Sequence, residues 1–232
     1  MSIEKLKQEL YSKSNPEKAE LEKRFFKTGK GEYGEGAIFL GLTSKEIKDI
    51  SRKYEDIKLE FLGELIKDKI HPFRVSALRI LNSKYKKSKN KKEIIDFYLA
   101  NTKNVNNWDL VDMSAYNLLG DFLIENKRDI LYDLVKSENL WEKRIAIIST
   151  YAFIKNNDFE DTLKISEILI NDTHDLIHKA VGWMLREIGN RNLEIEEKFL
   201  QKYYKQMPRT MLRYAIEKFE ETKRKKYLRG EI

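Results

Sequence analysis

The sequence predicts an all-α fold built from repeated helical units, and three observations lead to that prediction. Only three of the 232 residues are proline, and five of the ten glycines fall within residues 29–41, so few helix breakers stand elsewhere. Apolar residues recur at helical spacing, for example at Ile47, Ile50, Tyr54 and Ile57, and no segment shows the alternation of a strand. The third observation is a motif that recurs along the chain.

The recurring motif has an alanine at its centre. Similar segments lie at residues 71–78, 108–119, 141–146, 174–185 and 208–219, and their central alanines are separated by 38, 31, 34 and 35 residues: Ala77, Ala115, Ala146, Ala180 and Ala215. A small residue at one place in each unit lets neighbouring helices approach, and units of this length stack into an α-solenoid resembling HEAT-like repeats. Because no unit buries its apolar face alone, we expect one HEAT-like repeat domain over residues 1–232, with a concave basic groove.

Composition limits the partners and the chemistry. A net charge of +7 favours a polyanionic partner, although it equally fits ordinary solubility. The chain has no cysteine, which excludes disulfides, thiol nucleophiles, cysteine-ligated zinc and iron–sulfur clusters. Residues 1–6 do not resemble a signal peptide, and no uncharged apolar stretch is long enough to span a membrane. We therefore expect a cytoplasmic protein with no membrane association.

Two motifs resemble known ligand sites but lack the context those sites need. Residues 29–34 (GKGEYG) match G-x-G-x-x-G, but the preceding stretch 19–26 is charged and helical where a dinucleotide site requires a strand. This segment predicts a flexible or tightly turned loop. His174 and His178 have the i, i+4 spacing of zinc ligands, but no third ligand is evident, so we expect neither metal nor cofactor.

Charged residues suggest helix ends and surfaces. Asp172 with Asp175 three residues later resembles a capping box for the helix that carries Trp183, and Asn106 or Asn107 can cap the helix that carries Trp108. The stretch 84–92 holds six lysines. It is typical of a solvated loop or helix end, and a nucleic-acid contact is the alternative.

Trp108 and Asp112 are one helical turn apart, so an aromatic ring and a carboxylate would share one face of a helix. Tryptophans in all-α proteins are more often core than site, and this applies to Trp108, Trp141 and Trp183. Asp112 is harder to explain as core, because an ionised carboxylate is rarely buried without a partner. The structural alternative is an ion pair between Asp112 and Arg144 of a later repeat.

Five segments resemble the AlkD-type DNA glycosylases, which are alkylation-repair enzymes built from HEAT-like repeats. They are residues 27–36 (KTGKGEYGEG) with 39–41 (FLG), 107–112 (NWDLVD), 140–146 (LWEKRIA), 175–189 (DLIHKAVGWMLREIG) and 207–215 (MPRTMLRYA). They extend over nearly the whole chain, and the last two are the most specific.

The resemblance implies hydrolysis of the N-glycosidic bond of N3- and N7-alkylated purines in duplex DNA by a monomer, and it implies four functional residues: Trp108, Asp112, Arg144 and Trp183. Asp112 would stabilise positive charge on the sugar and direct a water, because an alkylated purine already carries the charge that lets it leave. The tryptophans would present aromatic faces to the cationic nucleotide, and Arg144 would hold a backbone phosphate. We expect further DNA contacts from Lys179, Arg186, Arg209 and Arg213.

Ala37 departs from the family pattern, which has an aspartate in the glycine-rich loop, and the contribution of that loop is left open. The absence of a lysine beside Asp112 in the sequence favours a glycosylase without strand-cleaving activity. The family is known to hold the lesion without an enclosing base pocket, whereas glycosylases usually flip the base, and the sequence does not choose between these modes. The alternative functions are a non-catalytic HEAT-like DNA-binding module and a protein-interaction scaffold.

Overall fold

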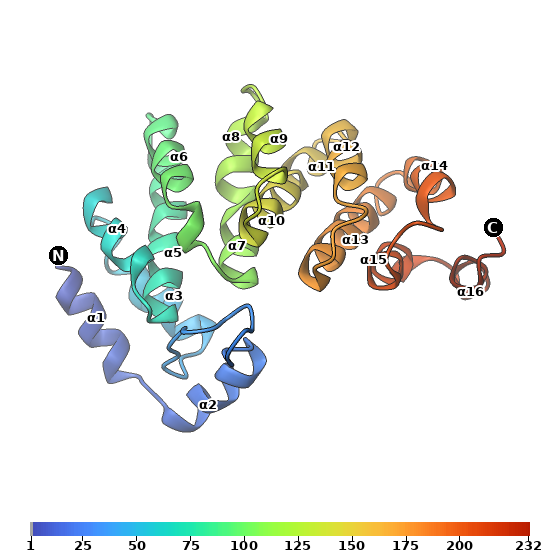
Figure 1. The fold of residues 1–232 in the computed structure, drawn as a ribbon. Coiled ribbons are helices and arrows are strands. Elements are labelled where there is room, and N and C mark those ends of the chain that lie inside the picture. Colours follow the sequence, from blue (N-terminus) through green and yellow to red (C-terminus); the bar gives the residue numbers. More distant parts are fainter. Residues whose placement is uncertain (1) are drawn as a thin grey trace. The chain divides into compact units, whose positions relative to one another are not determined.

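The computed structural model describes residues 2–232, and in that range it contains helices and no strand (Figure 1). The predicted all-α helical-repeat class is therefore confirmed. No helix in residues 2–232 combines the length and the apolar character that crossing a membrane requires. The chain divides into two compact units, the first ending at Ser114 and the second formed by Ala115–Ile232. The single repeat domain over residues 1–232 stays a prediction.

The first unit is built around one long central helix. Its elements are α1 (Ile3–Ser12), α2 (Pro16–Phe25), α3 (Ser44–Arg52), α4 (Leu59–Lys67), α5 (His71–Lys87), α6 (Lys91–Ala100), the 3-10 helix η1 (Thr102–Asn104) and α7 (Trp108–Ser114). Helix α5 contacts α1, α3, α4, α6 and α7. It is buried at nearly every position over its first three turns, as expected for a helix surrounded by others.

The second unit is also arranged around one helix. Its elements are the π-helical turn η2 (Tyr116–Gly120), α8 (Asp121–Leu123), α9 (Asp129–Val135), α10 (Leu140–Ser149), α11 (Tyr151–Lys155), α12 (Glu160–Ile168), α13 (Asp175–Gly189), α14 (Leu193–Tyr203), α15 (Arg209–Ala215), the 3-10 helix η3 (Ile216–Lys218) and α16 (Glu221–Arg229). Helix α13 packs on α10, α14 and α15, and Figure 1 shows it beside α15. A Cβ on Gly182 would collide with the carbonyl of Met211, so only glycine permits this approach.

The alanines at the centres of the repeats are buried, as their spacing predicts. All five are at most 1% exposed. Trp141 of α10 is only 7% exposed, so this tryptophan belongs to the core. The remaining two tryptophans are half-buried.

One carboxyl group of the second unit is buried. Glu196 of α14 is 1% exposed, and its carboxyl lies against Gly189 of α13, where a Cβ would collide with it. Burial, with a smaller contribution from the charge of Glu197, raises the pKa of the Glu196 carboxyl to about 9. Glu196 is therefore protonated at neutral pH.

Candidate active site

Helix α7 carries both Trp108 and Asp112, one turn apart and both half-buried, as the spacing predicts. Asn107 directly precedes the helix, and its Oδ1 accepts the backbone N–H of Trp108 at 2.8 Å. Behind α7 lies the fully buried Tyr98, whose hydroxyl is 3.0 Å from the Ser114 Oγ. Burial and, to a smaller extent, the charge of Asp112 raise the pKa of the Tyr98 hydroxyl.

Trp108 is the first ring of an aromatic stack that continues through Phe26 and Phe39 to His71. Phe26 covers one face of Trp108. The rings of Trp108 and Phe26 are 5.4 Å apart at 14°, those of Phe26 and Phe39 4.7 Å at 18°, and those of Phe39 and His71 4.6 Å at 29°. Phe25, which is 65% exposed, meets Trp108 edge-on at 5.7 Å. A planar ligand can therefore use only the opposite face of Trp108.

The glycine-rich loop builds this stack. A Cβ on Gly34 would collide with the carbonyl of Phe26, and two other glycines have φ of +78°: Gly31 and Gly36. The end of the loop is tied to the start of α5, because the Ile38 carbonyl accepts the N–H of His71 at 2.8 Å. Ala37 lies in a turn, with its N–H bonded to the Gly34 carbonyl at 3.1 Å. The segment is a tight turn that positions aromatic rings, and its contribution to function stays open.

A buried histidine fixes the start of α7, and sequence reasoning did not identify it. His71 Nε2 and Asp109 Oδ2 share a hydrogen bond of 2.8 Å. The neighbouring Arg74 is buried and donates to Asn106. Asp109 is therefore a structural carboxylate of α7. The signal for it in the sequence is the segment 71–74 (HPFR), where a histidine and an arginine stand at the start of a repeat.

Arg144 of α10 is almost fully enclosed in the second unit. The residue is 4% exposed, and its Nη1 donates to the Leu176 carbonyl of α13 at 2.5 Å. It thus joins two packed helices as a fixed donor. Its predicted contact with a phosphate stays a prediction.

Trp183 of α13 lies among polar partners. Its Nε1 donates to the Glu187 Oε1 at 3.0 Å, and the Tyr151 ring lies 6.0 Å away at a tilt of 42°. The Lys155 ammonium lies 5.3 Å from the centre of the Tyr151 ring and 5.2 Å from that of Tyr116. Trp183 is therefore oriented by a hydrogen bond and a tilted ring, with charges of both signs nearby.

Comparison with known proteins identifies the family. The family model described as DNA alkylation repair enzyme matches residues 6–219. The chain belongs to this family. The search of curated proteins found no match.

Two solved structures show the same fold as this DNA alkylation repair family member. A predicted DNA alkylation repair enzyme from Enterococcus faecalis has a TM-score of 0.74 and 17% identity, covering 90% of this chain and 97% of that one. AlkD2 from Streptococcus mutans has a TM-score of 0.55 and 19% identity, covering 86% and 99%. At this identity the likeness establishes the fold alone. The resemblance inferred from the sequence is confirmed at the level of the family.

The predicted DNA-binding cations of this family member have different surroundings. Arg186 pairs with Glu217, and Arg209 donates to the Leu228 carbonyl at 2.5 Å. Lys179 pairs with Asp175 at 2.7 Å. Lys179 and Arg213 both line one cavity of the second unit. Arg186, Arg209 and Lys179 are thus engaged within the protein, and Lys179 shares the cavity with Arg213.

His174 and His178, which have the spacing of zinc ligands, make structural hydrogen bonds. The predicted capping box of Asp172 and Asp175 is wrong. Helix α13 begins with His174 as its cap, whose Nδ1 accepts the N–H of Leu176 at 3.1 Å. Asp172 instead pairs with Lys143 at 2.8 Å, and His178 donates to the Asp172 carbonyl at 2.5 Å. In the described part of the chain, no three side chains of metal-ligating type come together.

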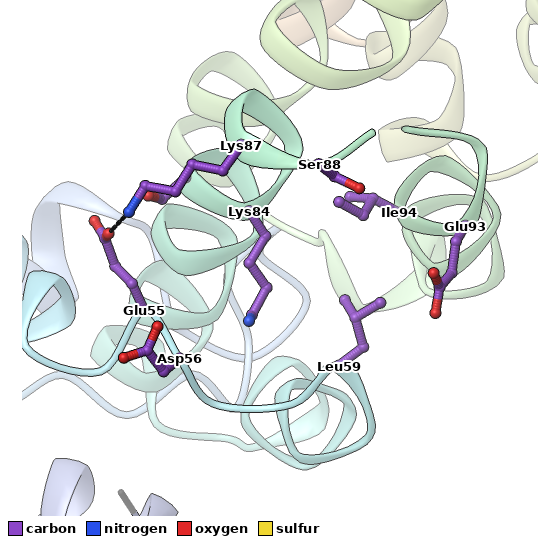
Figure 2. Close-up of a pocket in the computed structure, with 9 residues that line it drawn as sticks. Glu55, Asp56, Leu59, Lys84, Lys87, Ser88, Glu93 and Ile94 are labelled. Carbon is purple, nitrogen blue, oxygen red and sulfur yellow. Dashed lines mark hydrogen bonds and ion pairs between the residues drawn. The ribbon is translucent and has the colours of Figure 1, made fainter. Parts of the chain in front are cut away.

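The lysine-rich stretch forms the end of α5 and the start of α6, as predicted for a helix end. Lys84 and Lys87 line a pocket of about 340 Å³ together with three acidic residues, namely Glu55, Asp56 and Glu93 (Figure 2). Lys87 pairs with Glu55 at 2.5 Å, as Figure 2 shows. Three carboxylates thus offset the charge of the two lysines inside this pocket, and a nucleic-acid contact of the stretch stays a prediction.

Proposed function

We propose that this protein is a monofunctional DNA glycosylase that releases cationic N3- and N7-alkylated purines from duplex DNA. The observation that carries the proposal is the pairing of Trp108 and Asp112 on α7, in a chain that belongs to the DNA alkylation repair family. The enzyme acts as a monomer and uses no cofactor. Its partner is double-stranded DNA.

The proposed reaction needs one ionised carboxylate. In an N7- or N3-alkylated purine the ring is already positive, so the electrons of the C1′–N bond neutralise it when that bond breaks. Positive charge then develops on the sugar, and the Asp112 carboxylate stabilises it. As a water oxygen bonds to C1′, Asp112 accepts the proton that the water loses. The products are the free alkylated base and an abasic sugar.

The two tryptophans and Arg144 bind the substrate in this proposal. The free face of Trp108 and the ring of Trp183 attract the cationic nucleotide, with about 0.5–2 kcal/mol from each contact. Arg144 holds a backbone phosphate as a charge-assisted donor. The fixed geometry of Arg144 supports this role, because a donor already held in place loses less side-chain entropy on binding.

Lesion charge is the main determinant of specificity. A neutral lesion such as uracil or hypoxanthine needs protonation of its leaving group, and the proposed residues include no general acid. Excision of 7-methylguanine and 3-methyladenine should therefore be fast, and excision of uracil and hypoxanthine much slower.

A base-release assay tests the proposal. Duplex DNA that carries each of the four lesions is incubated with the protein, and the free base is measured. Comparable rates for uracil and 7-methylguanine would contradict the charge mechanism. Salt-sensitive DNA binding without any base release would support the non-catalytic DNA-binding module instead. Absence of DNA binding would support the interaction scaffold.

A further inference from the structure

A cavity of about 510 Å³ lies in the second unit, where α13, α15 and α16 meet. Cations from all three helices line it: Lys179 from α13, Arg213 from α15 and Arg224 from α16. The Thr210 hydroxyl and Tyr214 add polar groups. Arg224 lies beyond residues 6–219, the part of the chain that matches the family model.

The carboxylates in the wall are already engaged by other cations. Asp175 pairs with Lys179 at 2.7 Å, and Glu217 pairs with Arg186 of α13. Arg213 is exposed and makes no ion pair within residues 2–232. Its charge is therefore not balanced by a carboxylate of the cavity.

Arg224 also has unused hydrogen-bonding capacity. Its Nη1 pairs with Glu221 at 3.3 Å, but its Nε is buried without a hydrogen-bond partner. A guanidinium presents several N–H groups in one plane, and phosphate oxygens match that geometry. Two guanidiniums and one ammonium around a single space favour an anion with several oxygens.

We propose that this cavity is a binding site for one backbone phosphate of DNA, held jointly by Arg213 and Arg224. This assignment rests on the proposed function, because that function makes duplex DNA the partner. It adds Arg224 to the DNA-binding residues and gives Lys179 a supporting role.

The test is the salt dependence of binding to a short undamaged duplex. The variants are Arg213→Gln, Arg224→Gln and the double variant. Each lost phosphate contact lowers the slope of log K against log salt by about 0.9. Because both arginines are needed to hold the same phosphate, each single variant and the double variant should lose about 0.9 in slope, whereas two separate contacts would cost the double variant about 1.8. Thermal melting establishes that each variant is folded.

The matched control is Lys225→Gln, which removes one charge from the same helix. Lys225 is exposed, pairs with Glu221 at 3.4 Å and does not line the cavity. The slope of log K against log salt for the Lys225→Gln variant should stay close to that of the parent protein. An equal loss for Lys225→Gln and Arg224→Gln would reduce the effect to general charge and overturn the proposal. So would an unchanged double variant, or two additive losses.

A second arm uses inorganic phosphate as the probe. Thermal stabilisation by inorganic phosphate that disappears in the double variant, with an unchanged DNA slope, would assign the cavity to free phosphate and overturn the proposal. The salt slopes of DNA binding are measured without any catalytic step, so they test the phosphate site separately from the glycosylase activity. A parent protein that binds DNA with these slopes but releases no methylated base would refute the proposed glycosylase and leave the phosphate site standing.

Discussion

The two half-buried tryptophans are held in different ways. Trp108 in the first unit stacks flat on Phe26, within a series of rings that continues to His71. Trp183 in the second unit has a hydrogen bond to Glu187 and a tilted contact with Tyr151. The first ring is supported over a whole face, and the second is held at one edge.

This difference suggests different contributions to recognition. A stacked ring is a rigid surface, and only its free face meets a ligand. A ring fixed through its N–H keeps its faces for ligands and carries a carboxylate beside it, which adds attraction for a cation. We therefore expect Trp108 to set the position of the nucleotide and Trp183 to sense its charge.

The largest expected effect concerns the two carboxylates of α7. Asp112→Asn should lower excision by about 10²–10³ while folding and DNA binding persist, because the amide keeps the shape and loses the charge. Single-turnover excision of 7-methylguanine measures this. Asp109→Asn is the matched control, and it should lower the melting temperature by weakening the contact with His71. Excision by Asp112→Asn at the parental rate would make Asp112 structural.

The next largest effect concerns Arg144. Arg144→Ala should weaken binding to damaged and undamaged duplex alike by about 10- to 100-fold, the value of a charged hydrogen bond of about 1.5–3 kcal/mol. It should also lower the melting temperature, since the Leu176 carbonyl loses its donor. Binding titrations over a range of salt measure the first effect. Unchanged affinity and salt slope together with lower stability would assign Arg144 to the interior alone.

A smaller effect is expected at Trp183. Trp183→Ala should slow excision of cationic lesions by a few-fold to about thirtyfold, which corresponds to one cation–π contact of about 0.5–2 kcal/mol. Trp183→Phe keeps an aromatic face and should recover part of the rate. The comparison of 7-methylguanine with hypoxanthine measures charge sensing. An equal loss for both lesions would mean that Trp183 reads shape rather than charge.

The smallest effect is expected from the aromatic neighbours of the two tryptophans, Phe26 beside Trp108 and Tyr151 beside Trp183. Phe26→Leu should slow excision about two- to tenfold, because it removes a stacked pair worth about 0.5–1.5 kcal/mol. Tyr151→Leu, the corresponding change beside Trp183, should have less effect since that ring is tilted. Tryptophan fluorescence and excision rates measure both variants. A larger effect from Tyr151→Leu would reverse the comparison.

Local features of the fold and site were predictable from the sequence. The repeat alanines follow from spacing, and the shared helix face of Trp108 and Asp112 follows from a separation of four residues. The aromatic stack was not predictable, because Phe26 and Phe39 reach it through a loop whose path depends on positive φ angles and on a close approach at Gly34. His71 and Asp109 are 38 residues apart, and only packing brings them together.

The residue that caps α13 was also not predictable from the sequence, although the candidates lie close together in the chain. The sequence favoured Asp172, but Lys143, 29 residues earlier, pairs with that carboxylate, and His174 takes the capping position. Arg224 is a further case. Its contribution to the cavity depends on where α16 lies relative to α13 and α15. Tertiary contacts of this kind leave no periodic signal in the sequence.

The buried Glu196 makes folding a proton-binding reaction. An unfolded glutamate has its ordinary pKa near 4.5, while the folded value is about 9, so at neutral pH the native chain takes up about one proton at this residue. The contribution of Glu196 to stability is fully present below pH 4.5, and it declines as the pH rises toward 9. The proton must come from the buffer. The apparent enthalpy of folding near pH 7 should therefore vary with the ionisation enthalpy of the buffer used.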